Sequence, residues 1–161
     1  MTSVAQAQVR RWYEELGPTL LLYARSLATD ASAAEDALHQ VFLRLLSGEV
    51  AMPDDARPYL FRAVRNAAVN LRRAEVREMA RRAEAPRFEA PAELEEARIV
   101  LEDALESLPP EQREVVVLRT WGDMTFDEVG DVLGIPSNTA ASRHRYALEK
   151  LKERMAAFAT E

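Results

Sequence analysis

The most constraining feature of this sequence is a series of helix-start and helix-stop residues in its last third, between residues 108 and 155. Pro109-Pro110 can open a first helix, since proline suits a first turn, and Gly122 can close it in the left-handed conformation that glycine adopts without penalty. Thr125 and Glu128 then have the spacing of a capping box, which predicts the start of a second helix.

A third helix follows Gly134 and a sharp turn, and Ser137 can cap it. Helical spacing gives it an apolar inner stripe and a basic outer face. The stripe consists of Ala140, Ala147, Leu148, Leu151 and Met155, and the basic face of Arg143, Arg145, Lys150, Lys152 and Arg154. Two helices joined by a tight turn, the second of them basic, are typical of a helix-turn-helix, whose second helix enters the DNA major groove.

Composition favours an all-α protein throughout, because strand-like runs are nearly absent and apolar residues recur at helical spacing. The chain has no cysteine, which excludes disulfides and thiolate metal sites. Residues 1–11 lack the apolar core of a signal peptide, and no segment reaches the roughly 20 apolar residues of a membrane span. We therefore expect a cytoplasmic protein with no membrane span.

The formal net charge of -6 is unevenly distributed. Residues 57–82 carry eight arginines and two glutamates, whereas residues 83–106 carry eight acidic and two basic side chains. The basic segment can bind phosphate, and its acidic neighbour can compete for the same surface. We therefore expect the isolated chain to bind DNA weakly.

Four helices are predicted in the first half of the chain. Gly17-Pro18 separates the first from the second, since proline is well placed in a first turn. Ser32 and Glu35 form a capping box that starts the third helix, and Ser47-Gly48 ends it. A long, arginine-rich fourth helix begins near Arg57, after a proline-containing turn.

These helices group into two small domains. Residues 1–83 form a four-helix N-terminal domain, residues 84–92 a polar, proline-punctuated linker, and residues 93–161 the helix-turn-helix domain. The acidic stretch of residues 92–107 is predicted to be a helix that leads into the second domain.

This arrangement resembles the extracytoplasmic-function (group IV) sigma factors of bacterial RNA polymerase. The resemblance covers nearly the whole chain and rests on four strings, at residues 34–45, 59–70, 108–115 and 134–143 with Ala147-Leu148. It implies domains similar to sigma regions 2 and 4 in a protein that directs promoter-specific initiation. The implied partners are core RNA polymerase, through its β-prime clamp coiled coil and β flap, and promoter DNA. An anti-sigma factor is a further candidate partner.

By this resemblance the helix at residues 35–46 docks on the β-prime clamp. The implied polymerase-binding residues are Asp36, Gln40, Val41, Arg44 and Leu45. An exposed polar row on this helix can meet a partner helix, but a solvated face above a core stripe explains the same pattern.

The arginine-rich helix is implied to open and read the promoter -10 element. The implied residues are Tyr59, Arg62, Arg65, Asn66, Asn70, Arg72 and Arg73. Asparagine offers both a donor and an acceptor to the edge of an unstacked base, arginine neutralises phosphate, and Tyr59 and Phe61 can stack. In the alternative interpretation the arginines are merely solvated and the aromatic rings lie in the core, and we expect burial of at least one ring.

The last helix is implied to read the -35 element. The implied residues are Asn138, Thr139, Ala141, Ser142, Arg143, Arg145 and Tyr146. Arg145 is the expected base reader, because guanidinium pairs bidentately with guanine, and Thr139, Ser142 and Arg143 are expected to hold phosphates. Ala140-Ala141 departs from the family, in which a valine and a basic residue are frequent, and so does the acidic segment at residues 52–58.

Other classes of protein compete with this interpretation. The candidate metal group of Glu35, Asp36 and His39 lacks the second motif of a di-iron bundle, since the other histidine, His144, lies in the last helix. Phosphate loops and nucleophile elbows are also absent from the sequence. We therefore expect no metal, no cofactor and no enzyme. A sigma-like decoy that sequesters a partner, or a plain helix-turn-helix regulator acting at an operator, is the alternative, although the regulator leaves the arginine-rich helix unexplained.

Overall fold

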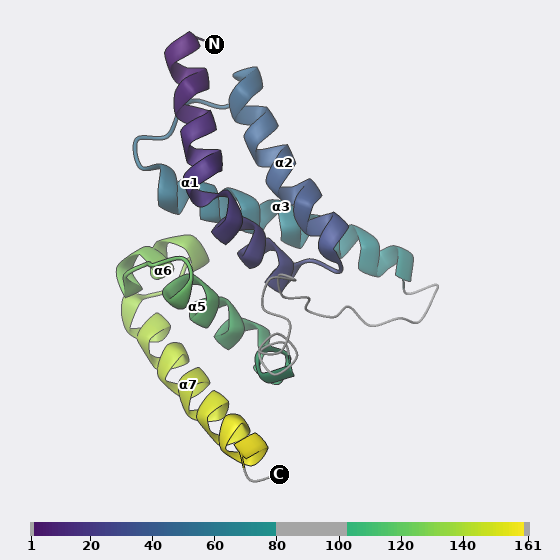
Figure 1. Ribbon diagram of the computed structural model, residues 1–161, viewed down its shortest axis with the longest axis vertical. Coiled ribbons are helices and arrows are strands. Elements are labelled where there is room, and N and C mark those ends of the chain that lie inside the picture. Colours follow the sequence, from purple (N-terminus) through teal and green to yellow (C-terminus); the bar gives the residue numbers. More distant parts are fainter. Residues whose placement is uncertain (1, 80–102, 160–161) are drawn as a thin grey trace.

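The computed structural model describes residues 2–79 and 103–159, and within these ranges it contains helices and no strand (Figure 1). The helices are α1 (Ser3–Leu27), α2 (Ala31–Ser47), α3 (Ala56–Met79), α5 (Pro110–Thr120), α6 (Phe126–Leu133) and α7 (Ser137–Ala159). Residues 103–106 add a helical turn ahead of α5. The all-α expectation is confirmed, whereas the linker at residues 84–92 and most of the acidic helix at residues 92–107 lie outside the described residues.

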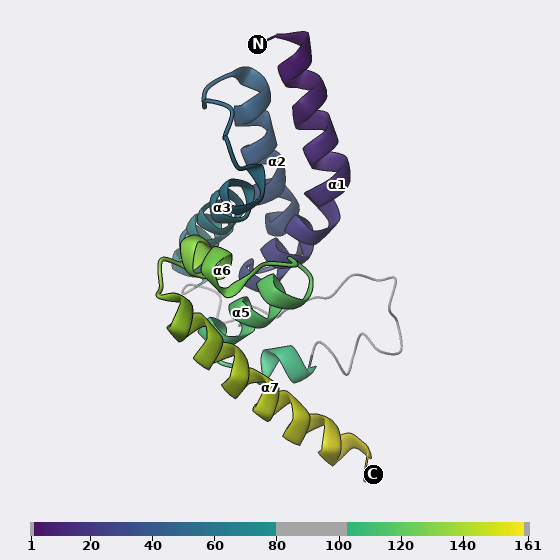
Figure 2. The ribbon, with the colours of Figure 1, turned by 90° about the vertical axis from the view of Figure 1, so that its left-hand side faces the viewer.

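Helix α1 is continuous where the sequence predicted a break. Gly17-Pro18 lies inside it, so the prediction of two short helices was wrong, and the described part of the N-terminal domain, residues 2–79, has three helices instead of four. A proline inside a helix removes one backbone hydrogen bond and bends the helix, and α1 changes direction along its length (Figure 2). Buried residues on both sides of the proline, Val9 and Leu20 among them, hold the two halves in one core.

Helix α2 starts slightly earlier than predicted, because Asp30 and not Ser32 is its N-cap. The Asp30 carboxylate accepts a hydrogen bond from the backbone N–H of Ala33 at 2.8 Å. Aspartate and serine can both cap a helix, so the sequence offers two possible N-caps two residues apart. Gly48 ends the helix in the left-handed conformation with a φ of 78°, as the sequence predicts.

The N-terminal domain is a three-helix unit in which α1 and α2 lie side by side and α3 crosses both (Figures 1 and 2). Its largest fully buried side chains are Tyr23, Phe61, Leu20, Leu45 and Leu60. The rings of Tyr23 and Phe61 lie 5.7 Å apart. Phe61 therefore confirms the expectation that at least one aromatic ring of α3 is buried.

The C-terminal domain is the helix-turn-helix that the sequence predicts. The capping box of Thr125 and Glu128 starts α6, and Gly134 ends it with a φ of 68°. Gly122, by contrast, does not take the left-handed conformation, which falls instead on Asp123 with a φ of 50°. Gly122 is needed for a different reason, since a Cβ at this position would lie 2.4 Å from the carbonyl oxygen of Leu118.

Helix α7 packs along only part of its length. Ala140 and Ala147 are buried as predicted, but Leu148 and Met155 are 47% and 57% exposed, so their assignment to the inner stripe was wrong. Leu148 lies on a different face from Ala147 and lines an open hollow with Phe126. Met155 lies near the C-terminal end of α7, which projects away from the core (Figure 2). Helical spacing identifies an apolar stripe, but it does not show how wide or how long a face the neighbouring helices cover.

The two domains contact each other directly, with α1 packed on α5 and α3 packed on α6. The arginine-rich helix α3 therefore lies against the helix-turn-helix domain, and this contact bears on which of its side chains face solvent.

Candidate nucleic-acid interface

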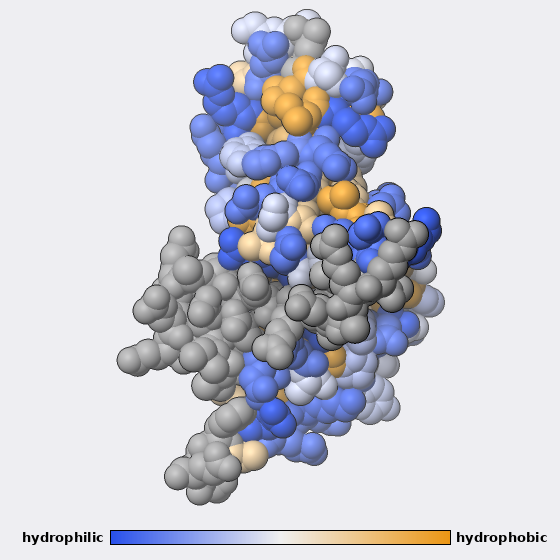
Figure 3. All heavy atoms as spheres, turned by 90° about the vertical axis from the view of Figure 1, so that its right-hand side faces the viewer, coloured by the Kyte–Doolittle hydropathy of each residue, from blue (hydrophilic) through white to orange (hydrophobic). Residues whose placement is uncertain are grey.

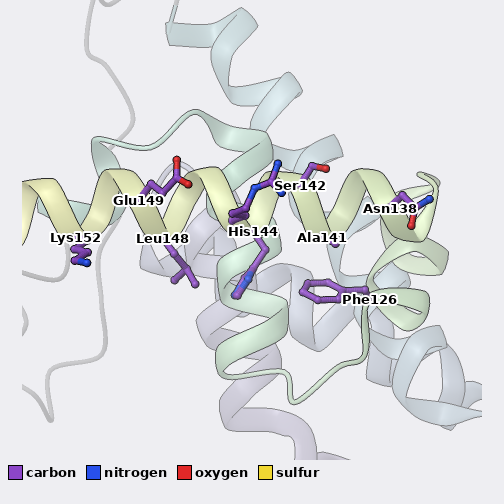
Figure 4. Close-up of a pocket in the computed structure, with 9 residues that line it drawn as sticks. Phe126, Asn138, Ala141, Ser142, His144, Leu148, Glu149 and Lys152 are labelled. Atoms are coloured by element: carbon purple, nitrogen blue, oxygen red, sulfur yellow. The ribbon is translucent and has the colours of Figure 1, made fainter.

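Helix α7 presents most of the residues expected to read duplex DNA. Asn138, Arg145 and Tyr146 are exposed, and Thr139, Ala141, Ser142 and Arg143 are half-buried. A hollow of about 680 Å³ runs along α7, and Figure 4 shows its lining. The hollow brings together four of the expected residues: Asn138, Ala141, Ser142 and Arg145. Thr139, Arg143 and Tyr146 do not line it.

Two ring contacts stiffen this surface. The Arg145 guanidinium lies over the ring of Tyr146, 5.2 Å from its centroid, which adds a cation–π contact. The ring of His144 meets the ring of Phe126 on α6 edge to face at 5.4 Å (Figure 4). Burial and the nearby Arg119 lower the pKa of His144, which favours the neutral imidazole. Sequence reasoning missed His144 as part of this surface, since only the fold brings Phe126 beside it.

A second hollow lies between α2 and α3 and has a volume of about 490 Å³. This α2–α3 groove is lined by Gln40, Val41, Arg44, Val50, Tyr59, Arg62, Ala63, Asn66, Ala67, Asn70 and Leu71. Asn66 and Asn70 are exposed one turn apart on α3, and Tyr59 in the same groove is half-buried. The groove thus joins residues expected at the -10 element to residues expected at the polymerase.

Several arginines of α3 hydrogen-bond to other parts of the protein, so they are not merely solvated. Arg62 donates to the backbone carbonyl of Asp131 with Nε at 3.2 Å and Nη2 at 2.8 Å. Arg65 pairs with the carboxylate of Glu114 on α5, with Nε 2.8 Å from Oε1. Arg72 donates weakly to the backbone carbonyl of Leu27 at 3.5 Å, whereas Arg73 is exposed. Two of the four arginines expected to hold phosphate are therefore bound to the C-terminal domain.

The expected polymerase-binding set divides by burial. Asp36, Gln40 and Arg44 are exposed along one side of α2, but Val41 is buried and Leu45 is fully buried. Leu45 was therefore wrongly assigned to the polymerase contact, because its side chain packs in the core of the N-terminal domain. Val41 contributes to the lining of the α2–α3 groove.

Sequence reasoning also missed an apolar surface beside this polar row. Leu43, Leu46 and Tyr13 are 63%, 41% and 42% exposed. They line a groove of about 510 Å³ between α1 and α2, together with Gln6, Val9, Arg10, His39 and Phe42. In the space-filling view, hydrophobic side chains gather near the end of the molecule where α1 begins (Figure 3). We call this the α1–α2 apolar groove. Leu43 and Leu46 follow the helical period of α2, but so do core residues, and periodicity alone does not tell the two apart.

The part of the chain at residues 2–79 and 103–159 holds no group of three or more histidines, cysteines or acidic residues arranged to bind a metal ion. In the same ranges, no helix combines the length and the apolar character that crossing a bilayer requires.

Two known sequence families match the chain. Sigma-70 region 2 matches residues 12–78, and Sigma-70, region 4 matches residues 104–153. The ECF RNA polymerase sigma factor SigL of Mycobacterium tuberculosis is 31% identical over 155 residues, which cover 91% of this chain and 88% of SigL. The RNA polymerase sigma-E factor of Streptomyces coelicolor is 32% identical over 142 residues, which cover 86% of this chain and 80% of that protein.

Solved structures share the fold. The sigma factor RpoE of Bartonella quintana, in complex with the anti-sigma factor NepR, matches with a TM-score of 0.74 at 22% identity, over 91% of this chain and 98% of that one. CnrH, in complex with the cytosolic domain of CnrY, matches with a TM-score of 0.65 at 24% identity, over 94% of this chain and 90% of that one.

The order of the two regions agrees with the order of the two helical domains, and both sequence relatives match along most of their length. The chain therefore belongs to the extracytoplasmic-function sigma factors of the sigma-70 family, which are promoter-specific transcription initiation factors.

Proposed function

We propose that this sigma factor docks on core RNA polymerase through α2, opens and reads the -10 element in the α2–α3 groove, and reads the -35 element with α7. The observation that carries the proposal is the α2–α3 groove itself. In it, Gln40 and Arg44 of the expected polymerase face lie beside Asn66 and Asn70 of the expected -10 reader. A strand separated at the polymerase surface would meet the asparagines directly.

The groove has the chemistry that an unstacked base requires. Turning a base out of the stack costs a few kcal/mol, and hydrogen bonds to its exposed edge must offset that cost. The side-chain amides of Asn66 and Asn70 supply donors and acceptors, and the half-buried ring of Tyr59 supplies a stacking surface. Duplex DNA does not present a base in this way, so the groove favours the open strand.

For duplex DNA we propose Arg145 as the base reader of α7. Its guanidinium is exposed and is oriented by the ring of Tyr146, so fewer of its rotamers must be frozen on binding. Thr139, Ser142 and Arg143, which are half-buried on the same helix, are proposed to hold the DNA backbone.

We propose that the exposed polar row on α2 meets the β-prime clamp coiled coil; the row consists of Asp36, Gln40 and Arg44. The C-terminal domain is proposed to contact the β flap. We further propose an anti-sigma factor as a partner, because the solved RpoE relative is a complex with such a protein and the α1–α2 apolar groove offers an exposed hydrophobic surface. We place the protein in the cytoplasm, where its polymerase works, and expect it to act as a binding factor while the polymerase supplies catalysis.

The test is transcription reconstituted from purified core RNA polymerase, this chain and a library of randomised promoter sequences. The proposal expects transcripts that depend on the chain and that share two sequence elements upstream of their start sites. Transcripts that are the same with and without the chain would overturn it. Recovery of a bound duplex without any transcription would support the operator-binding regulator instead.

A further inference from the structure

Helix α3 holds the helix-turn-helix domain through three arginines. Arg57 donates to the backbone carbonyl of Gly122, Arg62 to that of Asp131 and Arg65 to the carboxylate of Glu114. The three acceptors lie after α5, on α6 and on α5, so the contact spans both ends of the domain interface. The side chains that make this contact are arginines, which could otherwise bind DNA phosphates.

Glu114 is the buried centre of this contact. Its side chain is 10% exposed, and it accepts hydrogen bonds from Arg65 Nε at 2.8 Å and from the hydroxyl of Tyr23 at 3.0 Å. Tyr23 is fully buried on α1, so three helices from two domains meet at one carboxylate. Both of these donors belong to the N-terminal domain.

The energetics of such a group depend on the partner domain staying in place. A carboxylate that is buried and hydrogen-bonded to charge is stabilised, but the same carboxylate left without its donors carries a large desolvation cost. When the domains separate, Glu114 must therefore be hydrated, and the two domains cannot drift apart gradually. The contact should behave as a lock with a closed and an open state.

We propose that Glu114 locks the free chain in a closed form in which the C-terminal domain engages arginines of α3 that could otherwise bind phosphate. Most of the acidic segment at residues 83–106, which the charge distribution suggested as a competitor for phosphate, lies outside the described residues. The contact proposed here is a separate one, since Glu114 lies beyond that segment and the acceptors for Arg57 and Arg62 are backbone carbonyls. The guanidinium groups of Arg62 and Arg65 can pair fully with single-stranded DNA only after α5 and α6 have moved away, because Asp131 and Glu114 hold them in the closed form. This last step rests on the proposed function of the α2–α3 groove, whereas the lock itself does not.

Domain separation can be measured without reference to DNA. The chain has no cysteine, so Glu35→Cys on α2 and Lys150→Cys on α7, both at exposed positions, allow spin labels to be attached and their distance distribution to be recorded by pulsed electron resonance. We expect one narrow distribution for the otherwise unchanged chain. Glu114→Gln should broaden it towards longer distances, because the neutral amide no longer holds Arg65.

Glu111→Gln is the matched control. It makes the same change of charge on the same helix at an exposed position, and it should leave the distribution narrow. If Glu114→Gln does not fold, Arg65→Gln tests the lock from the other domain, with the exposed Arg77→Gln as its control. An unchanged distribution in a folded Glu114 or Arg65 variant would overturn the lock.

Masking is tested with a labelled single-stranded oligonucleotide of mixed sequence at low salt. A closed population lowers the apparent affinity by the fraction of open molecules, so Glu114→Gln should bind about tenfold more tightly than the unchanged chain, and Glu111→Gln should bind like it. Domain opening without tighter binding would overturn the masking. If no form of the chain binds single strands, the -10 assignment fails and the masking fails with it, while the distance measurement still decides the lock.

Discussion

The two basic helices of this sigma factor differ in how their arginines are used. On α3, Arg62 and Arg65 donate to the C-terminal domain, whereas on α7 Arg145 is exposed and lies over its neighbour Tyr146. On the helix with the higher density of arginine, two guanidinium groups are thus already engaged by the C-terminal domain. We infer that α7, the proposed duplex reader, is available in the free chain, while Arg62 and Arg65 of α3, the proposed single-strand reader, are released when the domains separate.

The largest effect is expected from a change on α2, which should weaken polymerase binding and leave duplex binding by α7 intact. Asp36→Arg with Gln40→Arg places positive charge on an exposed face without touching the core, and should weaken binding to core polymerase by about tenfold or more. Duplex binding by α7 should persist, because it does not depend on the polymerase. Co-purification with core enzyme measures the first effect, and wild-type polymerase binding by the folded variant would remove α2 from the docking surface.

The next largest effect should come from a change on α6 where this helix contacts the turn that leads to α7. A Cβ on Gly130 would lie 2.6 Å from the carbonyl oxygen of Ile135, so Gly130→Ala should lower the free energy of unfolding by about 1–3 kcal/mol. A Cβ on Gly17 would meet no side chain and no other helix within 4 Å, and Gly17→Ala should change that free energy by less than about 1 kcal/mol.

Urea unfolding followed by circular dichroism gives both values. The Gly130 variant should also lose binding to duplex DNA before it loses binding to single strands, since the turn positions α7. Equal stability of the two alanine variants would show that the turn yields without cost.

On α7, the expected effect is confined to recognition. Arg145→Ala should relax preference at one -35 position at a cost of about 1–3 kcal/mol, whereas Arg143→Ala should weaken all sequences alike. Binding to a library of duplex variants, selected from active promoters, measures both profiles. Identical base preferences for Arg145→Ala and the unchanged chain would contradict this division of roles.

The smallest effect concerns His144 on α7. Burial, and then Arg119, hold the pKa of His144 below its ordinary value of 6.5, so the unfolded chain binds its proton more readily than the folded one. Stability from this group is complete above the unfolded pKa and is lost as the pH falls from there through the lower pKa of the folded chain. Urea midpoints measured between about pH 7.5 and 5 should fall less steeply for His144→Gln than for the unchanged chain. Equal slopes for His144→Gln and the unchanged chain would contradict a lowered pKa of His144.

The helix-turn-helix could be predicted from sequence because its signals are local. Thr125 and Glu128 define the start of α6 and Gly134 its end, and each acts within one turn of the chain. The break at Gly17-Pro18 was predicted wrongly because proline competes there with burial on both sides, which is a property of the whole domain. Local sequence signals do not show whether burial of both halves of the helix outweighs the cost of the proline.

The sequence predicted which residue types make up the candidate site, but it did not predict which of their side chains are already bound within the protein. Asn66 and Asn70 line one groove, as their one-turn spacing implies, but the partner of Arg65 is Glu114, which is far along the chain and on another domain. Burial of Leu45 and exposure of Leu43 also depend on how α1 and α3 pack on α2. The pattern of charged and apolar residues along the chain therefore predicts the composition of each surface, but it does not predict which other elements pack against that surface.

We propose that the α2–α3 groove opens the -10 element while α7 holds the -35 element, and permanganate footprinting of unpaired thymines tests this division most directly. On a promoter selected from the library, holoenzyme with the unchanged chain should show reactive thymines around -10. Asn66→Ala with Asn70→Ala should lose most of this reactivity on duplex DNA, retain protection at -35, and recover on a template already mismatched around -10. Full thymine reactivity of the double variant on duplex DNA would contradict the account.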